Sequence, residues 1–512
     1  MDGTYLLGID IGTSGTKTAL FTAEGKLLAS ATVGYPLAQP RPGWAEQHPE
    51  DWWQAAARGV RLVLAEAGAQ AGVRPEEVVA IGLSGQMHGA VLLDKADAVI
   101  RPALIWCDQR SSPQAARLGE QVGQARIIEL TANPALPNFQ ATKLLWVKEN
   151  EPENYGRIAH VLLPKDYVRF RLTGEWATEV SDASGTLLLD VARRRWSAEM
   201  LDLLEVPSAW LPAVYESPEV SGRLSAAAAA ATGLRPGTPV AGGGGDQAAG
   251  AVGSGIVTEG LVSVTIGTSG VVFAFTPQLK ADPLGRLHTF CHAVPGKWHV
   301  MGVTQAAGGS LQWFRNTFGA AEIEVARQTG ADPYDYLTAA AARVAPGAEG
   351  VLFLPYLMGE RTPHLDPQAK GVFYGLTARH TRAHLARAVL EGVTFSLKDC
   401  LRLIEDLGID AQAVRLSGGG ARSALWRQMQ ADIFGRPAEV VSSAEGPAFG
   451  AALLAGVGAG LYPSVEEACQ ATIRSGERVE PSVGGVAAYA RAYARYRRLY
   501  PALKAIFAES DD

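Results

Sequence analysis

The pattern of apolar residues changes from strand-like runs at the start of the chain to helical spacing. Runs rich in β-branched and apolar residues cover Tyr5–Ile9, Thr18–Thr22 and Lys26–Val33. Three such runs in succession predict a β-meander. A helix is predicted from Pro49, because apolar residues then recur every three or four positions and acidic residues occupy its first turn, where they complement the helix dipole.

Strand and helix signals alternate along the rest of the chain. Further strands are predicted at Val78–Leu83, Ala90–Leu93, Ala103–Trp106, Val161–Leu163 and Val414–Leu416. Helices are predicted at Ala141–Glu149, Lys165–Leu172, Ala383–Asp406 and Ser423–Phe434, and a long amphipathic helix from about Val486 to Phe507. This mixture predicts an α/β protein.

One four-residue turn occurs in both halves of the chain, as Gly12-Thr13-Ser14-Gly15 and as Gly267-Thr268-Ser269-Gly270. Apolar runs enter and leave each turn, which predicts a β-hairpin. Glycines let the backbone approach a ligand, while neighbouring amides and hydroxyls donate hydrogen bonds, a combination that suits an anion. A single copy would indicate only an ordinary hairpin. Two copies favour a duplicated domain that holds a phosphate chain between its halves, as in actin-like ATPases.

A glycine run, Gly242–Gly245, leads from a predicted strand into Asp246 and a helix of small residues. Asp246 could be only a helix N-cap, a common role for aspartate. An N-cap, however, does not need four preceding glycines, which carry an entropic cost. The run therefore favours close passage of a ligand, and we predict that Asp246 is a catalytic carboxylate.

Another glycine loop, Ser417–Arg422, joins a predicted strand to a helix. A Rossmann-type phosphate loop would need Gly-x-Gly-x-x-Gly, which this segment lacks. A loop that faces adenosine in the second half fits the two-hairpin arrangement better.

Polar residues gather at the ends of two predicted strands in the first half. Gly85-Gln86-Met87-His88-Gly89 follows one strand, and Trp106 and Asp108 lie at the end of another. Gln, His and Asp offer donors and acceptors to a polyol, with Trp as an apolar wall. The alternatives are a packed loop histidine and a core tryptophan, and the residues alone leave both open.

Composition is that of a large globular protein. The 512 residues suit two domains, with a boundary that we place after residue 253. With 47% hydrophobic and 19% charged residues, a large core is expected and disorder is not. No basic block indicates nucleic acid, and no apolar run is long enough to span a membrane.

The four cysteines are scattered, which predicts reduced thiols and a cytoplasmic location; they are Cys107, Cys291, Cys400 and Cys469. His288, Cys291 and His292 are spaced closely enough to test as metal ligands. Their segment has the pattern of a strand and no fourth ligand is near, so we predict no metal there. The oligomeric state is not fixed by the sequence, and a homodimer is one expectation.

Several motifs together resemble the FGGY carbohydrate kinases over nearly the whole chain. They are Asp10–Gly15, Gly85–Ala90, Leu163–Tyr167, Gly243–Asp246, Gly267–Gly270, Leu354–Tyr356, Gly359–His364, Gly371–Leu376 and His384–Gly392. The resemblance implies two actin-like (ribonuclease H-like) ATPase domains with a cleft between them. Residues 1–253 would bind the sugar and residues 254–512 would bind ATP.

Within the family, Met87-His88-Gly89 resembles the motif of the branch that phosphorylates D-xylulose at O5. The alternative substrate is another ketopentose or a polyol, such as D-ribulose. The resemblance implies ATP and Mg²⁺ as cofactors. It also assigns roles to residues of this chain. Asp246 would accept the proton of the attacking hydroxyl as a weak base, and Asp10 would hold Mg²⁺.

The remaining roles follow from the same resemblance. Phosphates would be gripped by Gly12, Thr13, Ser14, Lys17, Gly267, Thr268 and Ser269. Adenosine would be lined by Gly418, Gly419, Gly420 and Ala421. The sugar would be held by Gln86, Met87, His88, Gly89, Trp106, Asp108 and Asp246.

Two other classes of protein share parts of this pattern. An actin-like chaperone or filament ATPase would not need the polyol-type residues Gln86–Gly89. A sugar-responsive regulator would give Asp246 no role, and no helix-turn-helix extension precedes Tyr5.

Overall fold

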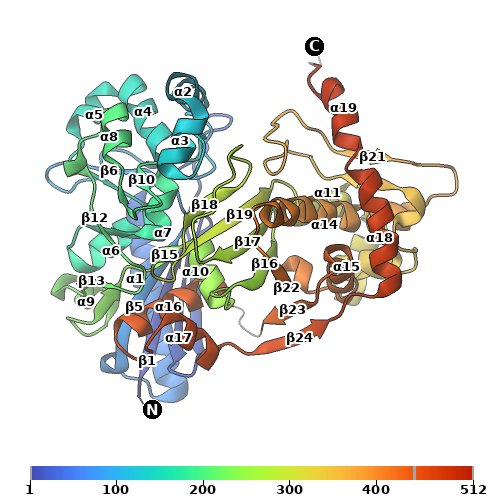
Figure 1. The fold of residues 1–512 in the computed structure, drawn as a ribbon. Helices are drawn as coiled ribbons and strands as arrows, with labels where there is room; N and C mark the ends of the chain where they lie inside the picture. Colours follow the sequence, from blue (N-terminus) through green and yellow to red (C-terminus); the bar gives the residue numbers. More distant parts are fainter. Residues whose placement is uncertain (1–2, 442–444, 510–512) are drawn as a thin grey trace.

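Two seven-stranded sheets form the centre of the computed structural model, which describes residues 3–441 and 445–509 (Figure 1). The first sheet consists of β13 (Val220–Arg223), β14 (Pro239–Ala241), β5 (Val78–Gly85), β1 (Tyr5–Ile11), β2 (Gly15–Thr22) and β3 (Leu27–Gly34), with β15 (Gly244–Gly245) beside β5. The second consists of β18 (His288–Cys291), β19 (Trp298–Thr304), β17 (Gly270–Thr276), β16 (Gly260–Ile266), β22 (Ala411–Gly418), β23 (Ala438–Val441) and β24 (Ser475–Val479).

The second sheet repeats the connectivity of the first. In the first, β1 pairs antiparallel with β2 and parallel with β5, and β2 continues antiparallel to β3. In the second, β16 pairs antiparallel with β17 and parallel with β22, and β17 continues antiparallel to β19. The repeat places the two Gly-Thr-Ser-Gly turns at equivalent hairpins. The predicted two-domain α/β fold is confirmed.

Helices pack on the sheets where the apolar pattern predicts them. The first is α1 (Pro49–Ala71), which starts at the predicted proline and packs against β2 and β3. Its buried face includes Trp52, Val60 and Val63, which recur at the predicted spacing. In the second half, α14 (Arg382–Asp406) packs against β19.

Other helices complete the layers. Those of the first half are α2 (Ser112–Leu118), α3 (Gln124–Thr131), α4 (Gln140–Asn150), α5 (Pro152–Arg157), α6 (Pro164–Thr173), α7 (Val180–Ala183), α8 (Ala198–Leu204), α9 (Ala226–Thr232) and α10 (Asp246–Gly253). Those that follow are α11 (Gly308–Phe318), α12 (Ala320–Thr329), α13 (Pro333–Ala342), α15 (Ala424–Phe434), α16 (Gly446–Gly458), α17 (Val465–Thr472), α18 (Val483–Tyr496) and α19 (Leu499–Phe507).

Helix α16 comes late in the chain but packs on the first sheet. A Cβ atom added to Gly8 of β1 would lie 1.9 Å from the carbonyl oxygen of Ala448, and one added to Gly82 of β5 would lie 1.8 Å from that of Ala451. Only glycine allows strand and helix backbones to approach this closely. Helix α17 stays beside α16, and the chain then returns to the second sheet at β24.

We therefore name two lobes by packing. The first lobe is residues 3–253 with residues 446–472, and the second lobe is the rest of the described chain. The domain boundary placed after residue 253 stays a prediction. The packing differs from a simple division at that point, because α16 and α17 return to the first lobe.

The C-terminal helix differs from its prediction. A single helix over Val486–Phe507 was expected from the apolar pattern, and the structure has α18 and α19 with a break at Arg497 and Arg498. Pro501 explains the break, because proline has no N–H to donate to the carbonyl group of Arg497 and its ring would clash with that group in a continuous helix.

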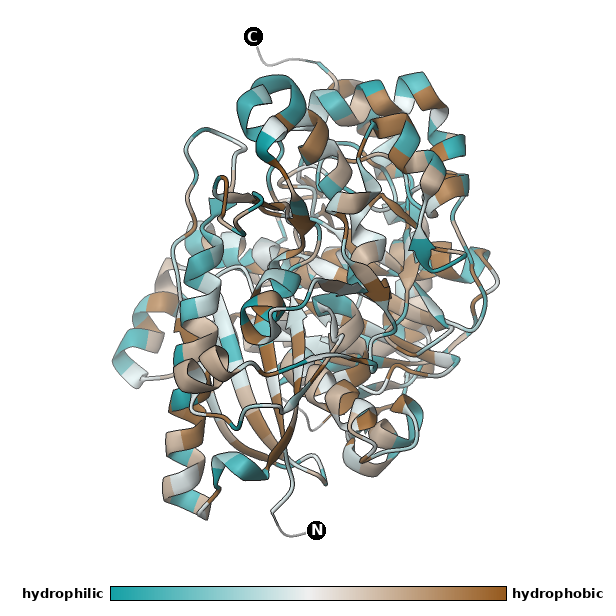
Figure 2. Ribbon diagram, turned by 90° about the vertical axis from the view of Figure 1, so that its left-hand side faces the viewer, coloured by the Kyte–Doolittle hydropathy of each residue, from teal (hydrophilic) through white to brown (hydrophobic). Residues whose placement is uncertain are grey.

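Apolar residues lie mainly along the strands and the inward sides of the helices, with hydrophilic residues on outward turns (Figure 2). Among the described residues, no helix is both long enough and apolar enough to cross a membrane.

Candidate active site

A cavity of about 590 Å³ lies between the two lobes. Asp10, Lys17 and Asp246 line it from the first lobe. The second lobe contributes Gly418 and Gly419, with Thr265 and Ser417 beside them. The structure thus brings together residues that were predicted from motifs hundreds of positions apart.

Two aspartates, Asp10 and Asp246, line this cavity. Asp246 is the first residue of α10, and Gly245 rather than Asp246 occupies the N-cap position. Burial raises the pKa of Asp246 to about 7, and the negative charge of Asp10 adds to the shift. Burial likewise raises the pKa of Asp10 to about 6, although the Ser84 hydroxyl and the charge of Lys17 lower it. Asp246 is therefore a stronger base than the sequence predicted.

One oxygen of Asp10, Oδ1, is buried without a hydrogen-bond partner. Such an oxygen is costly unless a ligand satisfies it. Lys17, on the neighbouring strand β2, forms an ion pair with Glu445 at the edge of the cavity. Glu445 was not among the predicted site residues, and nothing in its local sequence marks it.

A second cavity, of about 330 Å³, lies in the second lobe and shares Gly419 and Arg422 with the first. The predicted residues Gly267, Thr268 and Gly420 line it. Sequence reasoning missed the other part of its wall, which includes Gly308, Gly309, Leu311, Gln312 and Trp426. The adjacent glycines after β19 were the available signal.

Those glycines allow a close contact with the second hairpin turn. The amide of Gly308 donates to the carbonyl oxygen of Gly267 at 2.8 Å, and that of Gly309 donates to Thr268 at 3.0 Å. A Cβ atom on Gly308 would lie 2.5 Å from the Gly267 oxygen. The start of α11 thus fixes the turn that lines the cavity.

Gln86 supports the first hairpin turn. Its amide nitrogen Nε2 donates to Oε1 of Gln47 at 2.8 Å, and Nε2 of Gln47 donates to the carbonyl oxygen of Thr13 at 2.7 Å. The indole nitrogen of Trp106 donates to the Thr13 hydroxyl at 2.9 Å, while 37% of Trp106 stays exposed. The residues predicted to hold the sugar and the turn predicted to hold phosphates are therefore connected directly by hydrogen bonds.

His88 is buried with a defined tautomer. Its Nδ1 lies 2.7 Å from the carbonyl oxygen of Gly185, so Nδ1 must carry the proton and Nε2 is left as an acceptor. Burial lowers the pKa of His88 to about 3, and the hydrogen bond to Gly185 offsets only part of that shift. The ring packs edge-on against Phe139 at 5.0 Å.

The neighbours of His88 are packing residues in this structure. Met87 is buried against Gly245, where an added Cβ would lie 2.9 Å from the Met87 Cγ atom. A Cβ atom added to Gly89 would lie 2.6 Å from the Cγ atom of Pro164. Met87 thus lies directly against the glycine that precedes Asp246.

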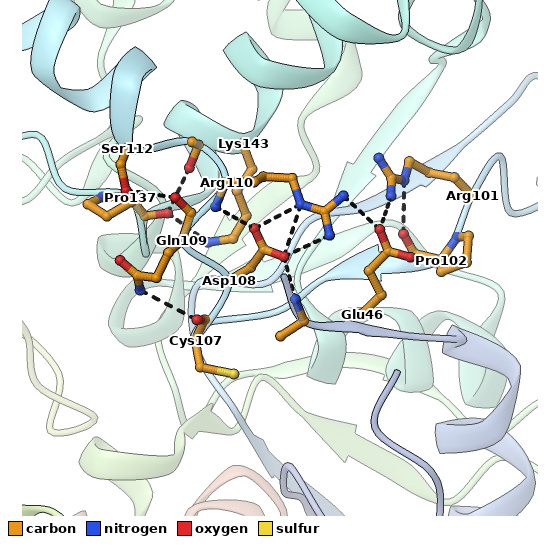
Figure 3. A network of polar contacts seen from close by, with 12 residues as sticks. Glu46, Arg101, Pro102, Cys107, Asp108, Gln109, Arg110, Ser112, Pro137 and Lys143 are labelled. Carbon is orange, nitrogen blue, oxygen red and sulfur yellow. Dashed lines mark hydrogen bonds and ion pairs between the residues drawn. The ribbon is translucent and has the colours of Figure 1, made fainter. Parts of the chain in front are cut away.

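Both carboxylate oxygens of Asp108 accept hydrogen bonds within an ionic network (Figure 3). Its Oδ1 accepts from the backbone and Nε of Arg110, and its Oδ2 accepts from the amide of Ala45 at 2.6 Å and from Nη2 of Arg110 at 2.8 Å. Arg110 also pairs with Glu46 at 2.7 Å. Direct contact of Asp108 with a sugar stays a prediction, while the observed bonds hold the loop that carries Trp106.

The segment that was tested for metal binding lies in the core. His288 stacks on Phe290 at 5.7 Å, and Cys291 and His292 are fully buried. Within the part of the chain that the structure describes, no three His, Cys, Asp or Glu side chains converge as a metal site.

Comparison with known families agrees with this geometry. The model of the N-terminal domain of the FGGY family of carbohydrate kinases matches residues 5–253, and the model of its C-terminal domain matches residues 262–459. The chain belongs to the FGGY family of carbohydrate kinases.

Individual FGGY relatives match the chain along nearly its whole length. The xylulose kinase of Escherichia coli is 44% identical over 98% of this chain and 100% of its own. That of Bacillus subtilis is 40% identical over 97% of this chain and 96% of its own. The crystal structure of xylulose kinase from Rhodospirillum rubrum superposes with a TM-score of 0.90 at 32% identity, covering 99% of this chain and 100% of that one.

Proposed function

We propose that this carbohydrate kinase transfers the γ-phosphoryl group of ATP to the O5 hydroxyl of D-xylulose, giving D-xylulose 5-phosphate. The observation that carries the proposal is the pair of carboxylates, Asp10 and Asp246, facing one cavity between two lobes. Support for the substrate comes from the xylulose kinases that match the chain from end to end.

Asp246 is the base in this proposal. In phosphoryl transfer the protein mainly positions the reactants and neutralises charge. A carboxylate with a pKa of about 7 is well matched to accept the proton of a sugar hydroxyl near neutral pH. Its place at the first turn of α10, beside the cavity, gives it access to that hydroxyl.

The site has features that suit Mg²⁺. The unsatisfied Oδ1 of Asp10 is a hard oxygen donor of the kind that Mg²⁺ prefers. Mg²⁺ commonly keeps several water ligands and binds through one or two carboxylates together with substrate phosphates, so one aspartate is a sufficient protein contribution. When bound, the ion would neutralise charge on the phosphates. Asp10 is therefore the proposed ligand.

The two adjoining cavities suit the two parts of ATP. Apolar Leu311 and Trp426, with the flat backbone of Gly419 and Gly420, form a wall that suits a nucleoside. The polyphosphate would extend past Gly419 toward the cavity between the lobes, where the two hairpin turns and Lys17 would meet it. Phosphates compete with Glu445 for Lys17, so the ion pair would open on binding.

The sugar would lie on the first lobe, near Asp246. Nε2 of His88 can accept a hydrogen bond from a hydroxyl, and the exposed face of Trp106 can cover the carbon chain. The free thiols of all four cysteines suit the reducing cytoplasm, where we place the reaction.

The test measures ADP release over a panel of pentuloses, pentoses and polyols, with the purified full-length protein. We expect D-xylulose to give the highest kcat/KM. D-ribulose or another polyol as the best substrate would contradict the substrate, and ATP turnover unaffected by any sugar would contradict the kinase activity itself.

The same assay tests the base. Asp246→Asn should lower kcat by about 10²- to 10⁴-fold and change the KM for sugar only a few-fold, because the carboxylate acts in the transition state. Asp202→Asn, at an exposed position of α8, is the control and should behave as wild type. An Asp246→Asn enzyme with most of its turnover would remove Asp246 from this role.

A further inference from the structure

A short helical segment lies against the glycine run that leads to Asp246. It consists of α7 and the 3₁₀ turn Ser184–Thr186, and Glu179 is its N-cap. Helix α7 contacts β15, the pair of glycines directly before Asp246. The proposed function uses the carbonyl oxygen of Gly185 in this segment but assigns no role to its side chains.

Glu179 is the fully buried centre of the hydrogen bonds in this segment. Its Oε2 accepts from the amide of Ser181 at 2.7 Å and from the hydroxyl of Ser217 at 2.8 Å. Its Oε1 accepts from the amide of Asp182 at 2.8 Å and from the hydroxyl of Ser181 at 3.0 Å. Lys165, also fully buried, lies 3.7 Å from Oε1 of Glu179, and it also contacts Asp166 at 2.6 Å and Asp182 at 3.6 Å.

These bonds fix the direction of the Ser181 hydroxyl. Because that hydroxyl donates its only proton to Glu179, its oxygen lone pairs face the other way. There the oxygen accepts from the backbone amide of Gly245 at 3.1 Å. A carboxylate, a hydroxyl and a backbone amide therefore form one chain that ends one residue before Asp246.

Ser217 meets the same carboxylate without the same consequence. The hydroxyl of Ser217 donates to Glu179 and has no bond to the glycine run. The backbone carbonyl oxygen of Ser217, and not its side chain, accepts from the amide of Gly243 at 2.9 Å. Removal of the Ser217 side chain leaves the bond to the glycine run in place. Removal of the Ser181 side chain breaks it.

We propose that Ser181, oriented by Glu179, is a positioning residue that holds the backbone of Gly245 and thereby aims the carboxylate of Asp246. The inference rests on the proposed role of Asp246. Glycines offer little stiffness of their own, so a run of four before the reacting group needs external bonds to fix it. A displacement of about 1 Å at a reacting group can cost about 10²-fold in rate.

The test compares Ser181→Ala with Ser217→Ala in the full-length protein. Both serines are buried and both donate to Glu179, so the two variants should lose similar thermal stability. We expect Ser181→Ala to lower kcat by about 10- to 100-fold with the KM for xylulose within about threefold. Ser217→Ala should keep kcat within about threefold.

Equal kcat values for the two variants, or an unchanged kcat in Ser181→Ala, would overturn the proposal. If Ser181→Ala does not fold, Ser181→Cys takes its place, because sulfur nearly preserves the volume but is a weak acceptor. A wild-type kcat in Ser181→Cys would also overturn it. Asp246→Asn is measured alongside: its full activity would refute the base, whereas its inactivity beside equal serine variants would refute only the positioning role.

Discussion

His88 combines a left-handed backbone conformation with a buried ring. Its φ of 70° is uncommon for a residue other than glycine, and such positions persist only where their surroundings hold them. Here the Nδ1 bond to Gly185 and the packing on Phe139 hold the side chain. With the pKa lowered to about 3, the ring stays neutral and Nε2 stays an acceptor at any pH at which the enzyme would be assayed.

His88→Ala should therefore cost about 2–4 kcal/mol of transition-state stabilisation for D-xylulose, because a sugar hydroxyl would lose its buried acceptor. An analogue that lacks the contacted hydroxyl should lose much less. The measurement is kcat/KM for D-xylulose, D-ribulose and a deoxy analogue, with His380→Ala in the second lobe as the control. An equal loss for all three sugars would indicate that His88 only packs.

The sequence identified the residues around the site better than their individual roles. Asp246 was predicted from a glycine run and Asp10 from the family resemblance, and both line the cavity between the lobes. His88, predicted from a strand-end pattern, lines neither of the two cavities, and its contact with a sugar stays a prediction. Asp108 and Gln86 have the same polar character, yet their side chains are satisfied by Arg110 and Gln47. Which polar groups are already paired depends on distant partners, and local sequence does not contain them.

At the scale of elements, hairpins and amphipathic helices could be predicted because their signals are local. The break in the C-terminal helix and the placement of α16 were not predicted, because they depend on more than the local apolar pattern. The break between α18 and α19 follows from Pro501, whose effect outweighs a continuous apolar stripe. The placement of α16 on the first sheet depends on a fit between glycines of β1 and β5 and a helix far along the chain.

That fit gives a direct test. Gly82→Ala would put a methyl group against the backbone of Ala451, which cannot move without shifting α16. We expect it to lower the free energy of unfolding by about 1–3 kcal/mol or more. The matched control is Gly156→Ala in α5, where an added Cβ would meet nothing within 4 Å and helix propensity favours alanine by up to about 1 kcal/mol.

Chemical denaturation of the two variants provides the measurement. Similar stabilities for Gly82→Ala and Gly156→Ala would show that α16 does not pack as described.

At the scale of the whole molecule, buried histidines link stability to pH. His299 stacks on Phe273 at 4.2 Å, and both of its ring nitrogens are buried without partners. Burial lowers its pKa well below the ordinary value of 6.5. Below pH 6.5 the unfolded chain then binds a proton that the folded chain does not, so this residue lowers stability as the pH falls.

In His299→Phe, the loss of unfolding free energy between pH 7.5 and pH 5.0 should be smaller by about 2 kcal/mol than in wild type. Buried acids such as Asp246 and Glu360, whose pKa values are raised to about 7, act in the opposite direction. They are common to both proteins and cancel in the comparison. Identical pH dependence in the two proteins would show that His299 is not the source.

The return of α16 and α17 to the first lobe also decides the order in which the protein can be completed. Strands β1 and β5 leave the ribosome early, but the helix that covers their glycine-bearing face is made only after almost the whole second lobe. Helices α16 and α17 of the first lobe lie in the sequence between β23 and β24 of the second sheet, so each lobe is built from two separate stretches of chain. A fragment that ends at residue 253 would expose an apolar face of the first sheet. In the full-length chain the same face stays uncovered during synthesis until residues 446–472 have been made.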